Sequence, residues 1–330
     1  VGCELKKKGV EKMKIKDVNR VPKHMTSIGG QALIEGILMR GPKDLAIAVR
    51  KPNNEIILKK EKLNTLGMRY KFFRLPLIRG LVGLVESMAF GSRALMYSAD
   101  FYEDGIEKDG NKETFLDRIF KEKSEEAEIV FTLMISLVFT ILLFILLPSL
   151  ITNFFKKGIE NPILLNLIEG LVRIMLFLTY VTVVSKMEDI GRVFEYHGAE
   201  HKTIHCYEHE EELTVENVKK YPILHPRCGT SFLFMVMIVS ILVLSFFGWP
   251  NPLQRVLIRL LMLPIIAGIS YEINRVIGKS NSAIAYYLSY PGLLIQRMAT
   301  VKEPDEAQIE VAIEALKAVL TDKKEEDLWK

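Results

Sequence analysis

Long apolar runs separate charged stretches along the chain. The longest run, at 129–155, contains no charged residue and exceeds the roughly 20 residues that a helix needs to cross a bilayer. Further apolar runs lie at 162–185, 230–249 and 256–277. This pattern predicts four transmembrane helices.

Shorter signals lie between and beyond these runs. Two aliphatic runs near 44–50 and 55–61 flank the turn sequence KPNN and predict a β-hairpin. Over 303–322, apolar residues recur at helical spacing behind an acidic start, which predicts an amphipathic helix. The run at 283–298 contains Pro291, and we expect it to break there and to lie at the membrane interface.

The stretch at 74–102 fits two placements. It is moderately apolar, and Arg79, Glu86 and Arg93 recur every seven residues, so the three charges share one stripe of a helix. This favours a helix that lies on the membrane surface or packs beneath it. A full transmembrane span is the alternative.

Together these elements predict a mainly α fold, a polytopic helical membrane protein with about four transmembrane helices. A cytoplasmic region would contain a small β-hairpin and amphipathic helices. The predicted divisions are a basic flexible arm at 1–28, a cytoplasmic and interfacial region at 29–127, a four-helix transmembrane region at 128–277 with a histidine-rich cytoplasmic loop at 186–228, and an interfacial segment with a cytoplasmic helix at 278–330.

Composition and charge agree with this division. Hydrophobic residues make up 49% of the chain and charged residues 25%, a mixture typical of membrane spans joined to water-facing segments. Lysine and arginine concentrate in the N-terminal region, the 186–228 loop and the C-terminal region, which predicts a multi-pass protein with both termini in the cytoplasm. Lys156 and Lys157 oppose this orientation mildly.

Other classes of protein receive no support. The net charge of +4 gives no reason to expect specific nucleic-acid binding. The three cysteines are too few and too scattered for a disulfide framework. No apolar segment near the N-terminus has the form of a signal peptide, so we expect the first hydrophobic span to act as the membrane signal.

Candidate chemistry concentrates in the 186–228 loop, where the stretch 196–212 carries four of the chain's six histidines at spacings of four residues. We expect a helix over 191–212 that continues from the second span. On such a helix His197 and His201 can bind one ion together, whereas His205 lies about 12 Å along the axis from His197. Either the 197/201 pair or the 201/205 pair would bind a metal, with further ligands from elsewhere.

Glu200 makes the first pair the sharper prediction. The sequence HGAEH has the form H-x-x-E-H, in which two histidines hold zinc and the glutamate acts as general base. The site still needs a third ligand. The candidates are Glu208, Cys206, His225 and Cys228.

His225 and Cys228 are the favoured candidates for the remaining ligands, because both ends of the loop must return to the same membrane face. A cysteine ligand would favour zinc or iron over magnesium. The predicted site therefore combines the general base Glu200 with a divalent metal, expected to be zinc. Its candidate ligands are His197, His201, His205, His225 and Cys228.

The same residues are also typical of a polar helix face at the level of the lipid headgroups. His209, among acidic neighbours, is expected to be solvated. Within the second span, Glu169 and Arg173 stand four residues apart and predict either a packing pair or a transport path. Arg259 is an alternative partner for Glu169.

Two further carboxylates have open assignments. Glu35 is expected either to pair with Arg40 or to serve the function. Glu272 and Arg275 lie near the inner end of the fourth predicted span, from which they could reach the loop site.

Three motifs give the chain a specific resemblance. GGQALIEGILMRGP at 29–42, YHGAEHKTIHCYE at 196–208 and LHPRCGTSF at 224–232 resemble the YqhQ-like family of bacterial multi-spanning membrane proteins, which carry a domain of unknown function. The resemblance extends over about 25–320. It implies a location in the bacterial cytoplasmic membrane and a metal-dependent enzyme. The residues on which this implication falls are His197, Glu200, His201, His205, His225 and Cys228.

The leading hypothesis is therefore an integral membrane metal-binding protein, acting as a metal-dependent hydrolase at the cytoplasmic membrane face. One alternative is a non-enzymatic scaffold that recruits a cytoplasmic partner such as a ribosome or a translocation assembly through 1–28 and the C-terminal helix. A second alternative is an oligomeric transporter that uses Glu169 and Arg173. The expected partners are the lipid bilayer, a cytoplasmic or ribosomal protein and further copies of the chain.

Overall fold

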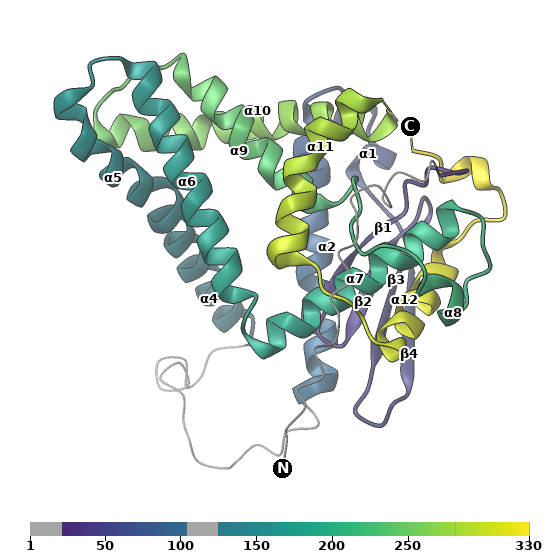
Figure 1. Ribbon diagram of the computed structural model, residues 1–330. Coiled ribbons are helices and arrows are strands. Elements are labelled where there is room, and N and C mark those ends of the chain that lie inside the picture. Colours follow the sequence, from purple (N-terminus) through teal and green to yellow (C-terminus); the bar gives the residue numbers. More distant parts are fainter. Residues whose placement is uncertain (1–21, 104–124, 281, 330) are drawn as a thin grey trace, which may run out of the picture.

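A computed structural model describes residues 22–103, 125–280 and 282–329. The chain is mainly helical and contains one four-stranded antiparallel sheet. Figure 1 shows two regions, a head in which helices cover the sheet and an arm of long apolar helices that extends away from it. The end of the predicted 29–127 region, a charged stretch at 103–127 that we expect to face water, lies almost entirely outside the described residues.

The sheet is a meander in the order β1-β2-β3-β4. Its strands are β1 (Gly29–Leu33), β2 (Gly36–Arg40), β3 (Asp44–Arg50) and β4 (Ile56–Lys62). The predicted hairpin is confirmed as β3 and β4. Strands β1 and β2 were not predicted, because each has only five residues and the residue that turns the chain between them, Glu35, is a non-glycine with a left-handed φ of 48°.

Alternation along the strands sends side chains to two different cores. On one face, Ile37, Met39, Ala46 and Ala48 pack against helices α7 (Glu188–Glu208) and α12 (Glu306–Val319). The alanines on β3 leave room for α12, and the predicted C-terminal amphipathic helix is thereby confirmed with its apolar face buried.

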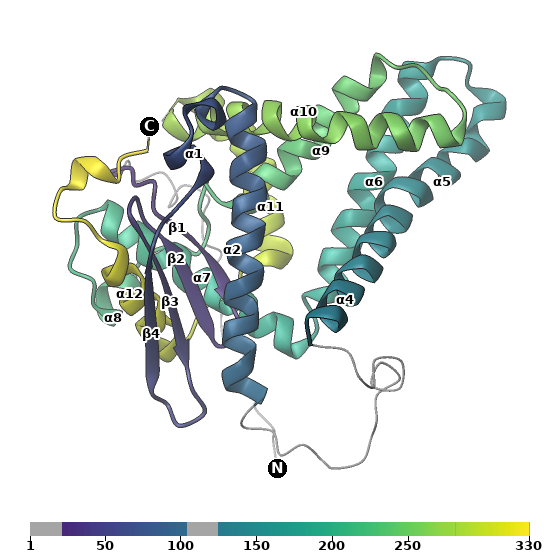
Figure 2. The same cartoon turned by 180° about the vertical axis from the view of Figure 1, so that it is seen from behind.

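Helix α2 (Ile78–Glu103) packs on the opposite face of the sheet and runs alongside β1 and β2 in Figure 2. Leu38 and Leu45 pack there with Ala94 of the helix. This helix corresponds to the predicted 74–102 segment, and it is not among the helices that are long and apolar enough to cross a membrane. Two short helices, α1 (Leu66–Arg69) and η2 (Lys71–Arg74), precede it.

The arm contains three helices long and apolar enough to cross a membrane, namely Met134–Phe155, α6 (Pro162–Val184) and α10 (Pro252–Lys279). The first of these combines parts of α4 (Glu125–Ile141), η3 (Leu142–Leu146) and α5 (Leu147–Phe155), and η4 (Lys156–Gly158) follows it. These correspond to the first, second and fourth predicted spans.

The third predicted span is shorter than expected. Helix α9 (Gly229–Ser245) has only 17 residues, where an apolar run of 230–249 was predicted. The helix ends early because Gly248 adopts a left-handed φ of 65° and prolines follow at 250 and 252. The prediction of about four spans is therefore corrected to three helices long enough to cross a membrane and one shorter apolar helix among the described residues.

Pro291 does not break its helix, contrary to prediction. Helix α11 (Ala283–Ile295) passes through the proline and continues as a π-helical turn, η5 (Gln296–Thr300). The proline removes one backbone hydrogen bond, but α11 packs tightly on α9, where Gly292 lies directly against Ser231. Tertiary packing therefore holds the helix together across the proline.

The segment that carries the histidines is a separate helix. Helix α6 ends at Val184 and α7 begins at Glu188, so the predicted continuous helix is interrupted at 185–187. The short helix α8 (Val215–Val218) follows α7, and η6 (Lys324–Glu326) follows α12.

The predicted arm at 1–28 is described only from residue 22. His24, Thr26 and Ile28 are buried, and Thr26 forms a β-bridge with Leu328. This part of the segment is therefore packed into the head.

Candidate metal centre

The central part of α7 is held between β1, α12 and a crossing segment that follows η5. At Gly198 an added Cβ would lie 2.0 Å from the carbonyl oxygen of Lys302, so only glycine lets this segment cross so closely. The Lys302 N–H donates to the carbonyl of Phe194 at 2.9 Å. The crossing brings the carbonyl of Thr300 next to His197.

His197, His201 and Cys228 form one compact donor group. One ligand atom from each side chain lies within 4.8 Å of the other two. Cys228 Sγ lies 3.3 Å from His197 Nε2. At Zn–N and Zn–S distances of about 2.0 and 2.3 Å, tetrahedral angles would hold such a pair of atoms roughly 3.5 Å apart. The observed spacing therefore suits a zinc ion.

Backbone carbonyls orient both imidazoles of this group. His197 Nδ1 lies 2.9 Å from the carbonyl oxygen of Thr300, and His201 Nδ1 lies 2.6 Å from that of Ile223. A carbonyl only accepts, so each ring donates from Nδ1 and keeps Nε2 as a lone-pair donor for a metal. Metal-binding histidines in proteins commonly have this second hydrogen bond.

Cys228 comes from a different element. It is the N-cap of α9, and its sulfur accepts the backbone N–H of Thr230 at 3.4 Å. Helix N-termini favour negative charge, so this position suits a thiolate ligand. The two ends of the loop meet here as predicted.

Glu200 lies between the two histidines in the sequence of α7, and its side chain faces β1. Its carboxylate accepts the N–H of Gly30 at 2.7 Å, and no other hydrogen bond from the described residues reaches it. Burial raises the pKa of the Glu200 carboxyl, while nearby His197 and the Gly30 N–H lower it by smaller amounts. A Cβ on residue 30 would lie 3.2 Å from the Glu200 carboxyl carbon and 2.4 Å from the carbonyl oxygen of Leu38, which explains the glycine.

His205, Glu208 and His225 form a second buried group, one turn further along α7. His205 Nε2 donates to the carbonyl of Leu224 at 2.9 Å. Arg227 donates to both oxygens of Glu208 at 2.5 Å, and the Thr26 N–H donates to one of them at 2.9 Å. The carboxylate is therefore already neutralised by a guanidinium.

His225 belongs to this second group rather than to the first. Its Nδ1 accepts the N–H of Arg227 at 3.3 Å, which leaves the ring proton on Nε2, 3.5 Å from Glu208. The side-chain amide of Gln296 holds its backbone from both sides, at 2.9 Å to the N–H and 2.9 Å to the carbonyl. Burial lowers the pKa of His205 and His225 well below the usual value.

The five predicted ligands are thus divided between two groups, and Cys228 is the third donor beside His197 and His201. Cys206 lies in neither group. Its sulfur faces the carbonyl of Glu212 at 3.6 Å, and burial raises the pKa of its thiol to about 12.

Several other predicted contacts differ in the structure. Glu35 pairs with Arg192 rather than with Arg40 and also accepts from Tyr196 at 3.1 Å, because its left-handed turn aims it at α7. Glu272 pairs with Arg79 of α2 and does not reach the loop site.

The remaining predicted contacts involve single side chains. Glu169 contacts both predicted partners, Arg173 and Arg259. His209 was expected to be solvated, but it is half-buried: its Nδ1 donates to the carbonyl of His205 at 2.7 Å, and its Nε2 is buried without a hydrogen-bond partner among the described residues. Sequence reasoning missed Gly30, Gln296 and Thr300, since they act through the backbone or through contacts distant in sequence.

Comparison with known proteins identifies the family. The model of a family described as "Protein of unknown function (DUF1385)" matches residues 75–322. The chain belongs to the DUF1385 family. The uncharacterized protein YqhQ of Bacillus subtilis (strain 168) is 32% identical over 303 residues, which cover 88% of this chain and 92% of that protein. No solved structure matches the chain.

The resemblance to YqhQ-like proteins is thereby confirmed. The DUF1385 match contains every residue of both donor groups, whereas the four strands precede it. The family description supplies neither an activity nor a metal.

Proposed function

We propose that this protein is a membrane-embedded, zinc-dependent hydrolase whose site lies at the inner membrane face. One observation carries the proposal. His197, His201 and Cys228 converge from two helices, and both imidazoles donate from Nδ1 to backbone carbonyls, so their Nε2 atoms remain available as ligands. Such an arrangement suits a metal better than a solvated polar face.

The membrane location draws support from the arm. Its three long helices carry large apolar side chains on their outer surfaces, including Met175, Leu261 and Leu137. Exposed apolar surface of this extent is unfavourable in water. Together with the distribution of lysine and arginine, it supports a multi-pass protein with both termini in the cytoplasm.

The number of ligands favours catalysis over a purely structural ion. Structural zinc sites usually have four protein ligands, whereas catalytic sites have three and leave one position open. Bound zinc supplies Lewis acidity and lowers the pKa of a coordinated water to about 7. Among the described residues, three side chains form the first group.

Glu200 is the general base in this proposal. It lies three residues after His197, so the two side chains are neighbours on the surface of α7. Burial raises the pKa of its carboxyl above the ordinary glutamate value, and a general base works best when its pKa is near the operating pH. The N–H of Gly30 fixes the carboxylate in place. Because Cys228 begins the apolar helix α9, a membrane-associated lipid or peptide is the expected substrate class.

The alternatives receive less support. The apolar face of α12 is buried in the head, so the scaffold hypothesis loses one of its two recruiting surfaces. Glu169 is held by Arg173 and Arg259, which suits a packing contact more than a transport path.

The test of metal binding is the zinc content of detergent-purified protein, measured by plasma mass spectrometry. We expect about one zinc per chain in the wild type and near zero in His197→Ala and His201→Ala. His209→Ala, four residues beyond the second donor group's first histidine, is the matched control and should keep its zinc. Full occupancy in both His197→Ala and His201→Ala would refute the proposed site.

The catalytic role of Glu200 has a separate test. In Glu200→Gln we expect zinc to stay bound while the hydrolysis of p-nitrophenyl acetate, a generic ester probe, falls by about 10²-fold or more. Glu210→Gln, an exposed glutamate beyond α7, serves as control. Equal rates in zinc-loaded wild type and Glu200→Gln would remove the general base and leave the metal site intact.

A further inference from the structure

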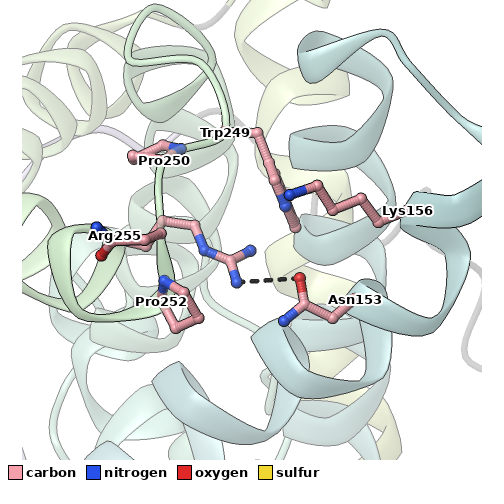
Figure 3. A pocket seen from close by; sticks show the side chains of 7 residues that line it. Asn153, Lys156, Trp249, Pro250, Pro252 and Arg255 are labelled. Carbon is pink, nitrogen blue, oxygen red and sulfur yellow. Dashed lines mark hydrogen bonds between the residues drawn. The ribbon is translucent and has the colours of Figure 1, made fainter.

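A second polar site lies at the other end of α9, far from the donor groups. A helix of 17 residues is about 25 Å long, and beyond its end a pocket of about 610 Å³ opens between α5 and the α9–α10 connection. It is lined by Asn153, Lys156, Trp249, Pro250, Asn251, Pro252 and Arg255. Figure 3 shows Arg255 and Lys156 extending toward the pocket from opposite walls.

Arg255 is buried but incompletely satisfied. Its side chain is 3% exposed, and its Nη2 donates to Asn153 Oδ1 at 3.2 Å. Its Nε and Nη1 have no hydrogen-bond partner among the described residues. The guanidinium lies 4.1 Å from the centre of the Trp249 ring, whose buried Nε1 also lacks a partner there. Two different side chains thus present unused N–H donors at this pocket.

The charges around the pocket do not balance. Glu169 is the acidic side chain in contact with this cluster, and it pairs with Arg173 at 2.9 Å and with Arg259. Arg255 Nη1 stands 3.9 Å from the same carboxylate, beyond hydrogen-bond distance. One carboxylate therefore faces three guanidinium groups, and none of the lining residues is acidic. A buried cation without a counter-charge is costly.

We propose that this pocket binds a phosphate group, which would supply the missing counter-charge. The planar fork of an arginine matches two phosphate oxygens, and a lysine on the opposite wall adds a second positive charge. Trp249 Nε1 provides a further donor. The pocket volume falls in the range of ligand sites in proteins.

The surroundings point to a phospholipid headgroup as the source of the phosphate. Phe154 and Phe246, at the ends of α5 and α9 beside the pocket, are 84% and 89% exposed. Aromatic residues are enriched where membrane helices meet the headgroup layer. Free inorganic phosphate shares the same chemistry, so the experiment includes both.

The experiment uses full-length protein in detergent and native mass spectrometry. The probes are dioleoyl phosphatidylglycerol, inorganic phosphate and dioleoylglycerol, which has the same acyl chains but no phosphate. We expect wild type to retain one phosphatidylglycerol and little dioleoylglycerol, and Arg255→Gln to weaken the lipid binding at least about tenfold. Lys186→Gln removes an exposed lysine at the opposite end of α6 and should bind as wild type does.

Each result decides the proposal. Binding of inorganic phosphate without the lipid would assign the site to free phosphate, and the loss of that binding in Arg255→Gln would still support the phosphate pocket. If Arg255→Gln does not fold, the exposed Lys156→Gln substitutes for it, with an expected weakening of about fivefold. Equal retention of the phosphate probes by wild type and the pocket variants, or equal retention of dioleoylglycerol, would overturn the proposal.

Discussion

The two donor groups on α7 contain similar residues and lie one turn apart. They differ in whether a cationic side chain of the protein is bound to them. In the first, His197, His201 and Cys228 each bring one ligand atom within 4.8 Å of the other two, and no hydrogen bond or ion pair from a cationic side chain among the described residues reaches them. In the second, Arg227 donates to both oxygens of Glu208. A group that already contains a cation has little need of a metal, whereas a group without one can use it.

The largest expected difference between the two groups follows from replacing Arg227. Its side chain is buried, and Arg227→Met leaves the Glu208 carboxylate buried without its counter-charge. We expect the free energy of unfolding to fall by about 3–5 kcal/mol, as for other buried pairs that lose one member. The measurement is denaturant unfolding in detergent.

The control for that variant is Lys317→Met, which breaks the exposed pair with Glu314. It should change the free energy of unfolding by less than about 1 kcal/mol. If both variants lose the same small amount, Arg227 is not the counter-charge of the second group.

Zinc content sharpens the distinction between the groups. Cys228→Ser and His225→Ala alter residues three positions apart in one loop, but they fall in different groups. We expect Cys228→Ser to weaken zinc binding by more than the roughly 10–100-fold that follows the loss of an outer partner, and His225→Ala to keep about one zinc per chain. Plasma mass spectrometry after dialysis gives the answer, and the reverse ranking would exchange the roles of the two groups.

The smallest expected difference between the groups is in the pH dependence of stability, which the buried histidines of the second group should change. Burial lowers the pKa of His205 and His225 well below 6.5, so they stay neutral in the folded protein when the unfolded chain takes up protons. The unfolded state then binds more protons, and stability falls as the pH drops below about 6.5. The loss for zinc-free protein is expected to reach at most about 1.4 kcal/mol per pH unit for each histidine.

This pH effect is read as a difference between two proteins. Burial raises the pKa of Glu200, which favours the folded state as the pH falls and so acts in the opposite direction. His225→Gln retains Glu200 and should lose less stability between pH 7 and 5.5 than wild type. Identical pH profiles in thermal unfolding with a chelator present would show that His225 does not titrate as its burial requires.

The sequence predicted the parts of this fold that repeat locally. The helical spacing over 303–322 predicted α12, and the KPNN turn predicted β3 and β4. Strands β1 and β2 were missed because their turn uses Glu35 in a left-handed conformation that favours glycine. The length of the helix predicted for the third apolar run was overestimated, because Gly248 ends α9 early.

The candidate site shows the same division. The i, i+4 spacing was enough to pair His197 with His201. The return of both loop ends to the same membrane face was enough to predict that Cys228 lies near this pair. His225 could not be separated from Cys228 by sequence, since its direction depends on the Gln296 amide, 71 residues away in the chain. The carbonyl of Thr300 carries no signal in the sequence at all.

The sheet and its covering helix have a consequence for the order in which the chain is synthesised. The face of β2 and β3 that carries Ile37 and Ala46 is covered by α12, which leaves the ribosome only after all four apolar segments. The β-bridge between Thr26 and Leu328 likewise forms only after the C-terminal residues have been synthesised. While the apolar helices of the arm are being translated, the nascent chain therefore exposes the apolar face of β2 and β3. We expect chaperone binding and misfolding at this stage of synthesis.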